Sequence, residues 1–272
     1  MWNLYQNEKF LEPLKFSNGK NQNDVVEEIL ELIGKGEKII FVHGECGTGK
    51  SAIALNIASR IGKTSVVVPN KNLQNQYKKD YEEDKYLLKK NGKKLKISVM
   101  TGRNNHPCKF LEDGKSVAPV FKKEVNSKLN DIFEFSKKEI DEKKKKDFSA
   151  DSPYIPCKIE IKEKNFYKIR EFLRQNKNVD LKEINKINDI RRIPLACVCP
   201  YWSPVLPEKY ETNKNLENAE KRTYQGLNNI KFAIYKRKGG CKFYEQFNSY
   251  IDSDAIIFNS LKYNLESALN RK

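Results

Sequence analysis

Short apolar runs recur along the chain at the length expected of buried strands. Each is rich in Ile and Val and is followed by a polar or turn-forming residue; they span residues 38–42, 65–68, 95–100 and 254–258. Such runs are typical of strands buried on both faces of a parallel sheet. Helices are expected among them, over residues 23–33, 52–61, 70–81 and 259–269. Strands that alternate with helices predict a doubly wound α/β sheet.

The first strand leads into a glycine-rich segment, GECGTGKS, that fits the phosphate-binding pattern G-x-x-x-x-G-K-[ST]. A strand before it and a helix after it are the context that this motif requires. The glycines let successive backbone N–H groups turn toward phosphates, and the helix N-terminus adds its positive end. We therefore predict a nucleoside triphosphate site formed by Gly44, Glu45, Cys46, Gly47, Thr48, Gly49, Lys50 and Ser51. In it, Lys50 neutralises the β- and γ-phosphates, and the Ser51 hydroxyl binds Mg²⁺.

The middle of the chain departs from the α/β pattern. Between residues 103 and 240 the alternation is lost, and residues 122–148 are dense in charge, with four consecutive lysines at 143–146. This stretch is expected to be a solvated helix or flexible loop, or a segment that grips nucleic acid. Five of the six cysteines lie in or beside this section, several next to Pro or Gly. Their spacing matches no zinc-finger or ferredoxin pattern, so both a metal centre and incidental cysteines fit the residues.

The α/β pattern then returns at residues 254–269, which predicts an insertion within one sheet. The expected domains are residues 1–102 with 243–272, and an insertion over 103–242. A P-loop ATPase also needs an apolar strand ending in an acidic residue, to hold Mg²⁺ and polarise water. None of the predicted strands ends in an acidic residue. The chain is therefore expected to be the front part of a larger ATPase, truncated or completed by a separate chain.

Composition limits the kinds of partner and the cellular compartment that we expect for this chain. The chain has 52 Lys and Arg against 36 Asp and Glu, a net charge of +16. This charge favours a polyanion, nucleic acid before a membrane surface, although a Lys-rich proteome explains it as well. No apolar run approaches the roughly 20 residues of a membrane span, and the N-terminus lacks a signal peptide's apolar core. We expect a cytoplasmic protein whose cysteines are metal ligands or free thiols rather than disulfides.

Two polar residues follow predicted strands. Asn70 and Thr101 stand where strands of such a sheet end, at the edge where ligands collect. An amide and a hydroxyl there can hold a phosphate backbone. Ordinary helix capping explains the same residues equally well.

Taken together, these segments resemble the front of an iron–sulfur DNA helicase of the XPD/DinG type, within helicase superfamily two. The similarity covers nearly the whole chain. It is carried by the segments GECGTGKSAIALNIA, VVVPNKNLQNQY, TGRNNHPC, CPYW and GGCKFYEQFNSYIDSDAIIFNSLKY. Asn70 replaces the family's usual Thr, and the D-E-A-H box and second motor domain are missing from the sequence.

The resemblance implies a RecA-like P-loop parallel sheet interrupted by a mostly helical, cysteine-bearing insertion. Four cysteines would hold a [4Fe–4S] cluster: Cys108, Cys199, Cys241 and either Cys157 or Cys197. We favour Cys157, since Cys197 and Cys199 are only two residues apart.

The resemblance also implies the partners. ATP and Mg²⁺ would bind at the P-loop with Gln22 near the adenine, and single-stranded DNA would contact Asn70, Gln74, Thr101 and Arg103. The cluster domain would split the duplex. A second polypeptide, or a missing C-terminal part, would carry the D-E-A-H box. Two alternatives stay open: a non-enzymatic ATP- and DNA-binding subunit of a split helicase, and a zinc-containing P-loop regulator.

Overall fold

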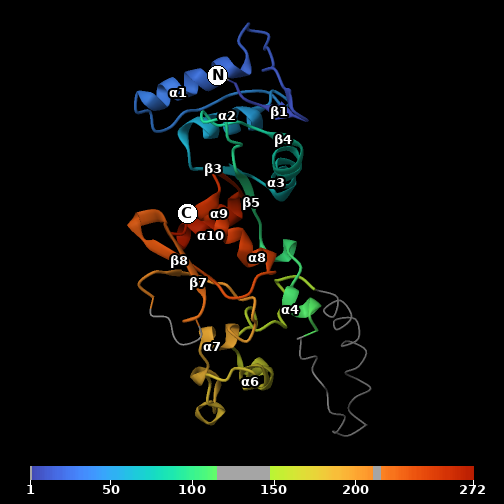
Figure 1. Cartoon of the computed structure of the whole chain (residues 1–272), viewed down its shortest axis with the longest axis vertical. Helices are drawn as coiled ribbons and strands as arrows, with labels where there is room; N and C mark the ends of the chain where they lie inside the picture. The colour runs from blue at the N-terminus through green and yellow to red at the C-terminus, as the bar shows by residue number, and fades with distance from the viewer. Residues whose placement is uncertain (1, 115–147, 211–215) are drawn as a thin grey trace. The chain divides into compact units, whose positions relative to one another are not determined.

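The computed structural model describes residues 2–114, 148–210 and 216–272, and the lysine run at 143–146 lies outside them. The chain divides into two compact units (Figure 1). Unit 1 comprises Met1–Thr101, Gly226–Asn228 and Asn248–Lys272. Unit 2 comprises Gly102–Gln225 and Asn229–Phe247. Among the described residues, no helix is both long and apolar enough to cross a membrane.

A three-stranded parallel sheet forms the centre of unit 1. Its strands β3 (Thr64–Val68), β9 (Ala255–Asn259) and β5 (Ile97–Met100) stand in the order β3-β9-β5. All three strands lie within or close to the predicted runs, which confirms those predictions. β9 is hydrogen-bonded on both edges, and all five of its residues are buried, as a continuous apolar run requires. The result is a mixed α/β fold with a parallel sheet, consistent with a RecA-like domain.

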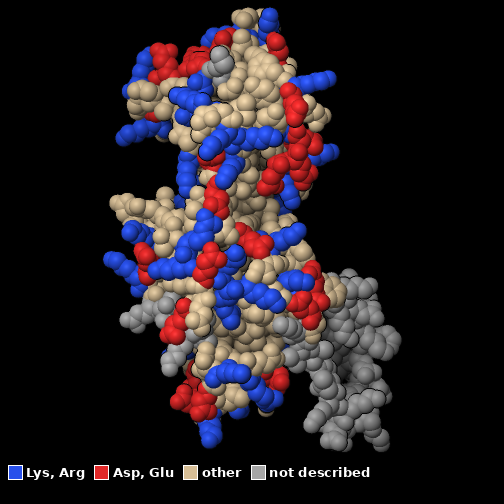
Figure 2. Space-filling view, in the orientation of Figure 1, with Lys and Arg blue, Asp and Glu red and all other residues tan. Residues whose placement is uncertain are grey.

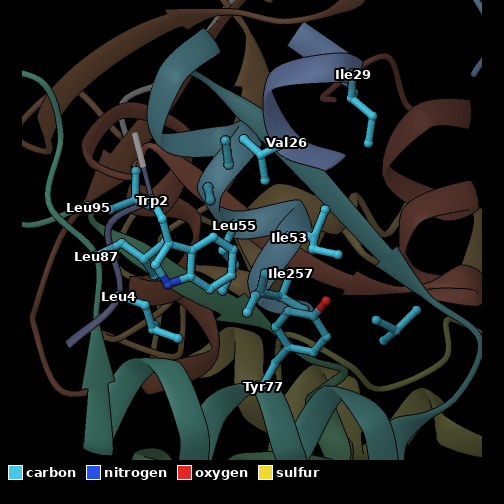
Figure 3. Close-up of a cluster of buried hydrophobic side chains, with 14 residues drawn as sticks. Trp2, Leu4, Val26, Ile29, Ile53, Leu55, Tyr77, Leu87, Leu95 and Ile257 are labelled. Carbon is cyan, nitrogen blue, oxygen red and sulfur yellow. The ribbon is translucent and has the colours of Figure 1, made fainter. Parts of the chain in front are cut away.

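Helices and a small second sheet complete unit 1. The helices are α1 (Gln22–Gly34), α2 (Lys50–Ile61), α3 (Lys71–Tyr77), α9 (Ser249–Asp252) and α10 (Ser260–Ala268). α3 continues as a π-helix over Lys78–Asp84. The strands β1 (Tyr5–Gln6), β2 (Lys9–Phe10) and β4 (Lys85–Tyr86) pair antiparallel in the order β2-β1-β4. Trp2, Leu4 and Val26 pack with Leu55 and Ile257 in one core, which joins the N-terminal segment to α1, α2 and β9 (Figure 3).

The strand predicted before the glycine-rich loop is absent from the structure. Residues 38–42 have no strand conformation, and the side chains of Ile39 and Phe41 are 73% and 93% exposed. A strand requires a neighbour that takes its backbone hydrogen bonds. Among the described residues, no strand pairs with this segment. The apolar composition of residues 38–42 was therefore not enough to make this segment a strand.

Unit 2 lies in sequence between β5 and β9. Its short helices are α4 (Lys109–Glu112), α6 (Phe166–Arg174), α7 (Arg192–Ala196) and α8 (Lys242–Glu245). It also contains an antiparallel sheet, in the order β6-β8-β7, of β6 (Val205–Pro207), β7 (Glu220–Gln225) and β8 (Lys231–Lys236). The prediction of a mostly helical segment missed this sheet. Its central strand β8 buries Phe232 to Tyr235, whereas the partner β7 is largely charged and carries no strong strand pattern.

A buried ion pair lies within α10, and a hydrogen bond from Tyr250 joins it to α9. The Lys262 Nζ lies 2.6 Å from Glu266 Oε1, and Glu266 is 1% exposed. The Tyr250 hydroxyl donates to the other carboxylate oxygen at 2.8 Å. Because both oxygens of this buried carboxylate have a donor, its desolvation is offset.

Gln74 of α3 bonds to the central strand β9 and to its neighbour β5. Its Nε2 donates to the Met100 carbonyl at 2.7 Å and to the Ile257 carbonyl at 3.3 Å. Its Oε1 accepts from Asn259 Nδ2 at 3.0 Å. The side chain is 1% exposed, so one amide ties α3 to β5 and β9 inside the core.

We expect Gln74→Ala to lower the free energy of unfolding by about 2–4 kcal/mol, since buried carbonyl and amide groups lose their partners. Gln76→Ala is the matched control: its amide is exposed on the same helix, 3.5 Å from Asp80. That control should change the free energy by less than about 0.5 kcal/mol. Denaturant unfolding followed by circular dichroism measures both. Equal effects would contradict the role of Gln74.

Candidate functional site

The glycine-rich loop contains two left-handed glycines and leads directly into a helix. Gly47 and Gly49 adopt left-handed φ angles of 85° and 73°, which favour glycine. α2 starts directly after Gly49, and no side chain caps its first turn. Its leading N–H groups, and the positive end of its dipole, are therefore directed at the loop. The helix predicted after the loop is present, whereas the strand predicted before it is absent, and triphosphate binding at residues 44–51 stays a prediction.

Lys50 and Ser51 have defined partners at this loop. The Lys50 Nζ donates to the Gly44 carbonyl at 2.8 Å and to the Glu45 carbonyl at 2.6 Å, so the ammonium group lies against the loop. The Thr48 Oγ1 also donates to the Glu45 carbonyl, at 2.8 Å. Burial raises the pKa of Tyr77, while its hydrogen bond with Ser51 opposes that rise. Tyr77, from α3, is a neighbour of the loop that sequence reasoning missed, because only the fold brings it there.

Gln22 reaches the loop from α1 and is buried. Its Nε2 donates to the Thr48 carbonyl at 2.9 Å, and its Oε1 accepts from the Leu14 N–H at 2.9 Å. The amide thus contacts the loop backbone directly. Its predicted place beside an adenine stays a prediction.

The four residues expected to touch DNA differ in their exposure and in their partners. Asn70 is exposed and caps α3, accepting from the Leu73 N–H at 3.0 Å, and Thr101 is half-buried just after β5. Gln74 is buried in the sheet, so its amide is not available to a phosphate. Arg103 belongs to unit 2 and is half-buried. We therefore propose no DNA contact for Gln74 or Arg103.

Arg103 lies instead beside one of the cysteines. Its guanidinium donates to the Tyr244 hydroxyl at 2.8 Å, to the Ala150 carbonyl at 3.1 Å and to Cys157 Sγ at 3.7 Å. The same group lies 4.4 Å from the centre of the Phe243 ring, a cation–π contact. These contacts hold the positive charge of Arg103 beside the thiol of Cys157.

Three cysteines have backbone donors at sulfur. Cys108 and Cys241 stand at the N-caps of α4 and α8, where the N–H groups of the turn that follows lower the pKa of each thiol, although neither side chain makes a capping hydrogen bond. The Cys199 thiol accepts from the Tyr201 N–H. Such donors favour a thiolate, although burial raises the pKa of Cys241 to about 11 and also that of Cys108.

Cys157 and Cys199 are directly hydrogen-bonded to each other. The bond from Cys199 lowers the pKa of Cys157 to about 6; burial opposes this shift and the Arg103 charge adds to it. The same bond raises the pKa of Cys199, and burial adds to that rise. Cys108 also interacts electrostatically with Cys157, Cys199 and Cys241. Four thiols therefore lie within electrostatic reach of one another.

Cys197 stands apart from this thiol cluster, which we define as Cys108, Cys157, Cys199 and Cys241. Burial raises its pKa to about 11, and the charge that acts on it is Arg237 rather than another thiol. Cys46, the sixth cysteine, is exposed in the glycine-rich loop. Among the described residues, no three His, Cys, Asp or Glu side chains are arranged to hold a metal ion.

Packing next to the thiol cluster joins three chain segments. Gly240, before Cys241, has a φ of 115°, and a Cβ there would lie 3.5 Å from Lys109 Cγ and 3.6 Å from Tyr201 Cε1. Lys109 Nζ pairs with Asp113 at 2.9 Å, and Asp113 also accepts from the Tyr201 hydroxyl. The segments that follow Cys108 and Cys199 therefore pack against Gly240, the residue before Cys241.

Comparison with known proteins adds one match. A family model described as "Type III restriction enzyme, res subunit" matches residues 15–191, more than half of the chain. The matched range includes the glycine-rich loop, β3, β5, Cys108 and Cys157. No curated protein and no solved structure matches the chain.

The low pKa of Cys157 predicts selective reactivity in chelator-treated, metal-free protein. At pH 7 a thiol with a pKa of about 6 is mostly thiolate, whereas Cys197, at about 11, is protonated. Iodoacetamide should alkylate Cys157 faster than Cys197, as measured by peptide mass spectrometry. Arg103→Leu should slow the labelling of Cys157, because removing the cation raises its pKa. Equal rates at the two cysteines would contradict the assignment.

Proposed function

Because the chain belongs to the family of type III restriction enzyme res subunits, and so contains the N-terminal motor region of a superfamily-two helicase, we propose that it is the front part of an ATP-dependent DNA helicase with an iron–sulfur domain. The observation that carries this proposal is the cradle at residues 44–51, within the matched range. The thiol cluster of unit 2 supports the finer, iron–sulfur part. ATP with Mg²⁺ is the cofactor that the family suggests.

In this function the loop residues bind the triphosphate and Lys50 supplies positive charge. Lys50 exchanges its two carbonyl contacts, to Gly44 and Glu45, for phosphate oxygens. Ser51 offers its hydroxyl oxygen to Mg²⁺, and its side chain is hydrogen-bonded with Tyr77. Hydrolysis also needs a carboxylate that orients water, which the proposed function assigns to another part of the motor.

We propose that this other part includes a strand that pairs with residues 38–42. This segment leads to the loop and has strand composition, yet Ile39, Phe41 and Val42 are exposed. An added strand would bury these side chains and take up the segment's backbone hydrogen bonds. A second polypeptide or a C-terminal continuation could provide it.

The proposed ligands of a [4Fe–4S] cluster are Cys108, Cys157, Cys199 and Cys241. The Arg103 cation and the backbone N–H groups near sulfur favour thiolates, the form that binds iron, whereas burial and the neighbouring thiols raise the pKa of Cys108, Cys199 and Cys241. No site for a single ion is formed among the described residues, and four irons with bridging sulfides need thiolates set further apart than one ion does. When bound, the cluster would cross-link the segments of unit 2, which would then act as a rigid wedge in the duplex.

The proposed DNA contacts are Asn70 and Thr101, which lie after the carboxyl ends of β3 and β5. Such positions collect ligands in parallel sheets. Lys and Arg side chains are spread over both units on the face shown in Figure 2 and are mixed with Asp and Glu. The charge on this face supports a general attraction to nucleic acid rather than a single marked track.

Metal analysis tests the iron–sulfur part. Anaerobically purified chain should be brown and contain about four iron atoms, since each [4Fe–4S] cluster holds that number. Cys157→Ser should remove most of the iron, and Cys197→Ser should retain it. Cys197 is a matched control because it is a buried cysteine of the same unit. A colourless, zinc-containing protein would favour the zinc-regulator alternative and overturn the cluster.

Salt dependence of DNA affinity tests the nucleic-acid part. The affinity for a labelled single-stranded oligonucleotide, measured by fluorescence anisotropy, should fall steeply as salt is added. A plot of the logarithm of the association constant against the logarithm of the salt concentration should fall with a slope of about 0.7 for each phosphate contacted. Asn70→Ala should weaken binding about fivefold, the loss of roughly one hydrogen bond. Asn91→Ala is the control, because Asn91 also caps a backbone N–H, of Lys93, in an exposed turn. A flat salt response would count against DNA as the partner.

A further inference from the structure

The proposed nucleotide-binding function does not explain why the carboxamide of Gln22 is buried. The side chain is 3% exposed, although it belongs to the first residue of α1. A residue that reads a base offers its amide to an open pocket. This amide has both ends engaged by the protein backbone.

One end of Gln22 is fixed by the segment that precedes α1. The Leu14 N–H donates to Gln22 Oε1 at 2.9 Å, and the Gln22 N–H donates to the Leu14 carbonyl at 3.0 Å. A β-bridge between Lys15 and Asn21 extends this pairing. Asn21 then caps α1 in a capping box with Asp24. Gln22 is therefore held in place by its main chain as well as its side chain.

The other end of Gln22 fixes the glycine-rich loop. Its Nε2 donates to the Thr48 carbonyl at 2.9 Å, which orients the peptide that leads into Gly49. A Cβ on Gly49 would come within 2.1 Å of the same Nε2, so amide and loop are in close contact. Gly49 has a left-handed φ and directly precedes α2, whose N–H groups would face the phosphates.

We propose that Gln22 is a positioning residue for the triphosphate and does not read the base. It holds the Thr48–Gly49 peptide so that the loop and the first turn of α2 present their N–H groups to phosphate oxygens. This inference rests on the proposed nucleotide-binding function. It predicts that Gln22 contributes to the affinity for every triphosphate, whatever base it carries.

The test compares ligands with and without a base. Isothermal titration of the full chain with Mg²⁺ and ATP, GTP or inorganic tripolyphosphate gives three dissociation constants. Gln22→Leu and Gln22→Glu both remove the donor to the Thr48 carbonyl, and the second keeps the size and the acceptor of the side chain. Both should weaken all three ligands by a similar factor, about five- to thirtyfold, as expected for a buried carbonyl left without its donor. The ratio of ATP to GTP affinity should stay unchanged.

Two further variants separate positioning from general damage. Gln76→Ala removes an exposed amide and should leave all three affinities unchanged. Gly49→Ala introduces a Cβ that would clash with Gln22 Nε2. Gln22→Ala removes this Nε2, so Gly49→Ala should weaken tripolyphosphate binding less in the double variant than in the otherwise unsubstituted chain. Circular dichroism checks folding, and if Gln22→Leu does not fold, Gln22→Glu decides.

The outcomes are distinguishable. Loss of affinity for ATP alone, with tripolyphosphate unaffected, would overturn this inference and assign Gln22 to the adenine. Unchanged affinity for all three ligands would overturn it as well. If the unsubstituted chain binds none of them, the proposed function fails and the inference with it.

Discussion

The pairing of β9 between β3 and β5 is the constraint on which the rest of unit 1 depends. β9 is hydrogen-bonded along both edges, and its apolar side chains complete the core that also holds α1 and α2. β5 and β9 are neighbours in the sheet, although unit 2 separates them in sequence. Non-local pairing of this kind is stable only when the burial of β9 outweighs the entropy of closing so long a connection. Gln74 and Asn259 then satisfy the polar groups where these strands end.

The same physical problem, buried polarity, recurs in the nucleotide loop and in unit 2. In the loop, the buried Gln22 amide donates to the Thr48 carbonyl and accepts from the Leu14 N–H. In unit 2, Arg103 and the N–H groups after Cys108 and Cys241 supply positive potential to buried sulfur. Groups of this kind are costly to bury singly and are stable as networks.

The match to the restriction-enzyme family and the geometry of the loop concern the same segment of the chain. The match covers residues 15–191, and within this range the loop has two left-handed glycines and leads into a helix whose first turn no side chain caps. Unit 2 adds a feature of its own, the thiol cluster. Two of its members, Cys199 and Cys241, lie beyond the matched range. The iron–sulfur part of the proposal therefore depends on the side-chain interactions of unit 2.

The sequence by itself determined the elements whose signal is local. The strands 65–68 and 254–258 have continuous apolar composition, and the glycine-rich loop has fixed spacing, so both were predicted from neighbouring residues alone. Tertiary structure decided what depends on partners distant in the chain. Residues 38–42 have strand composition but no paired strand, and Gln74 and Arg103 lie in surroundings that their polarity did not predict. Whether a polar side chain faces solvent or a buried acceptor is set by packing between segments, and a pattern of neighbours does not contain that information.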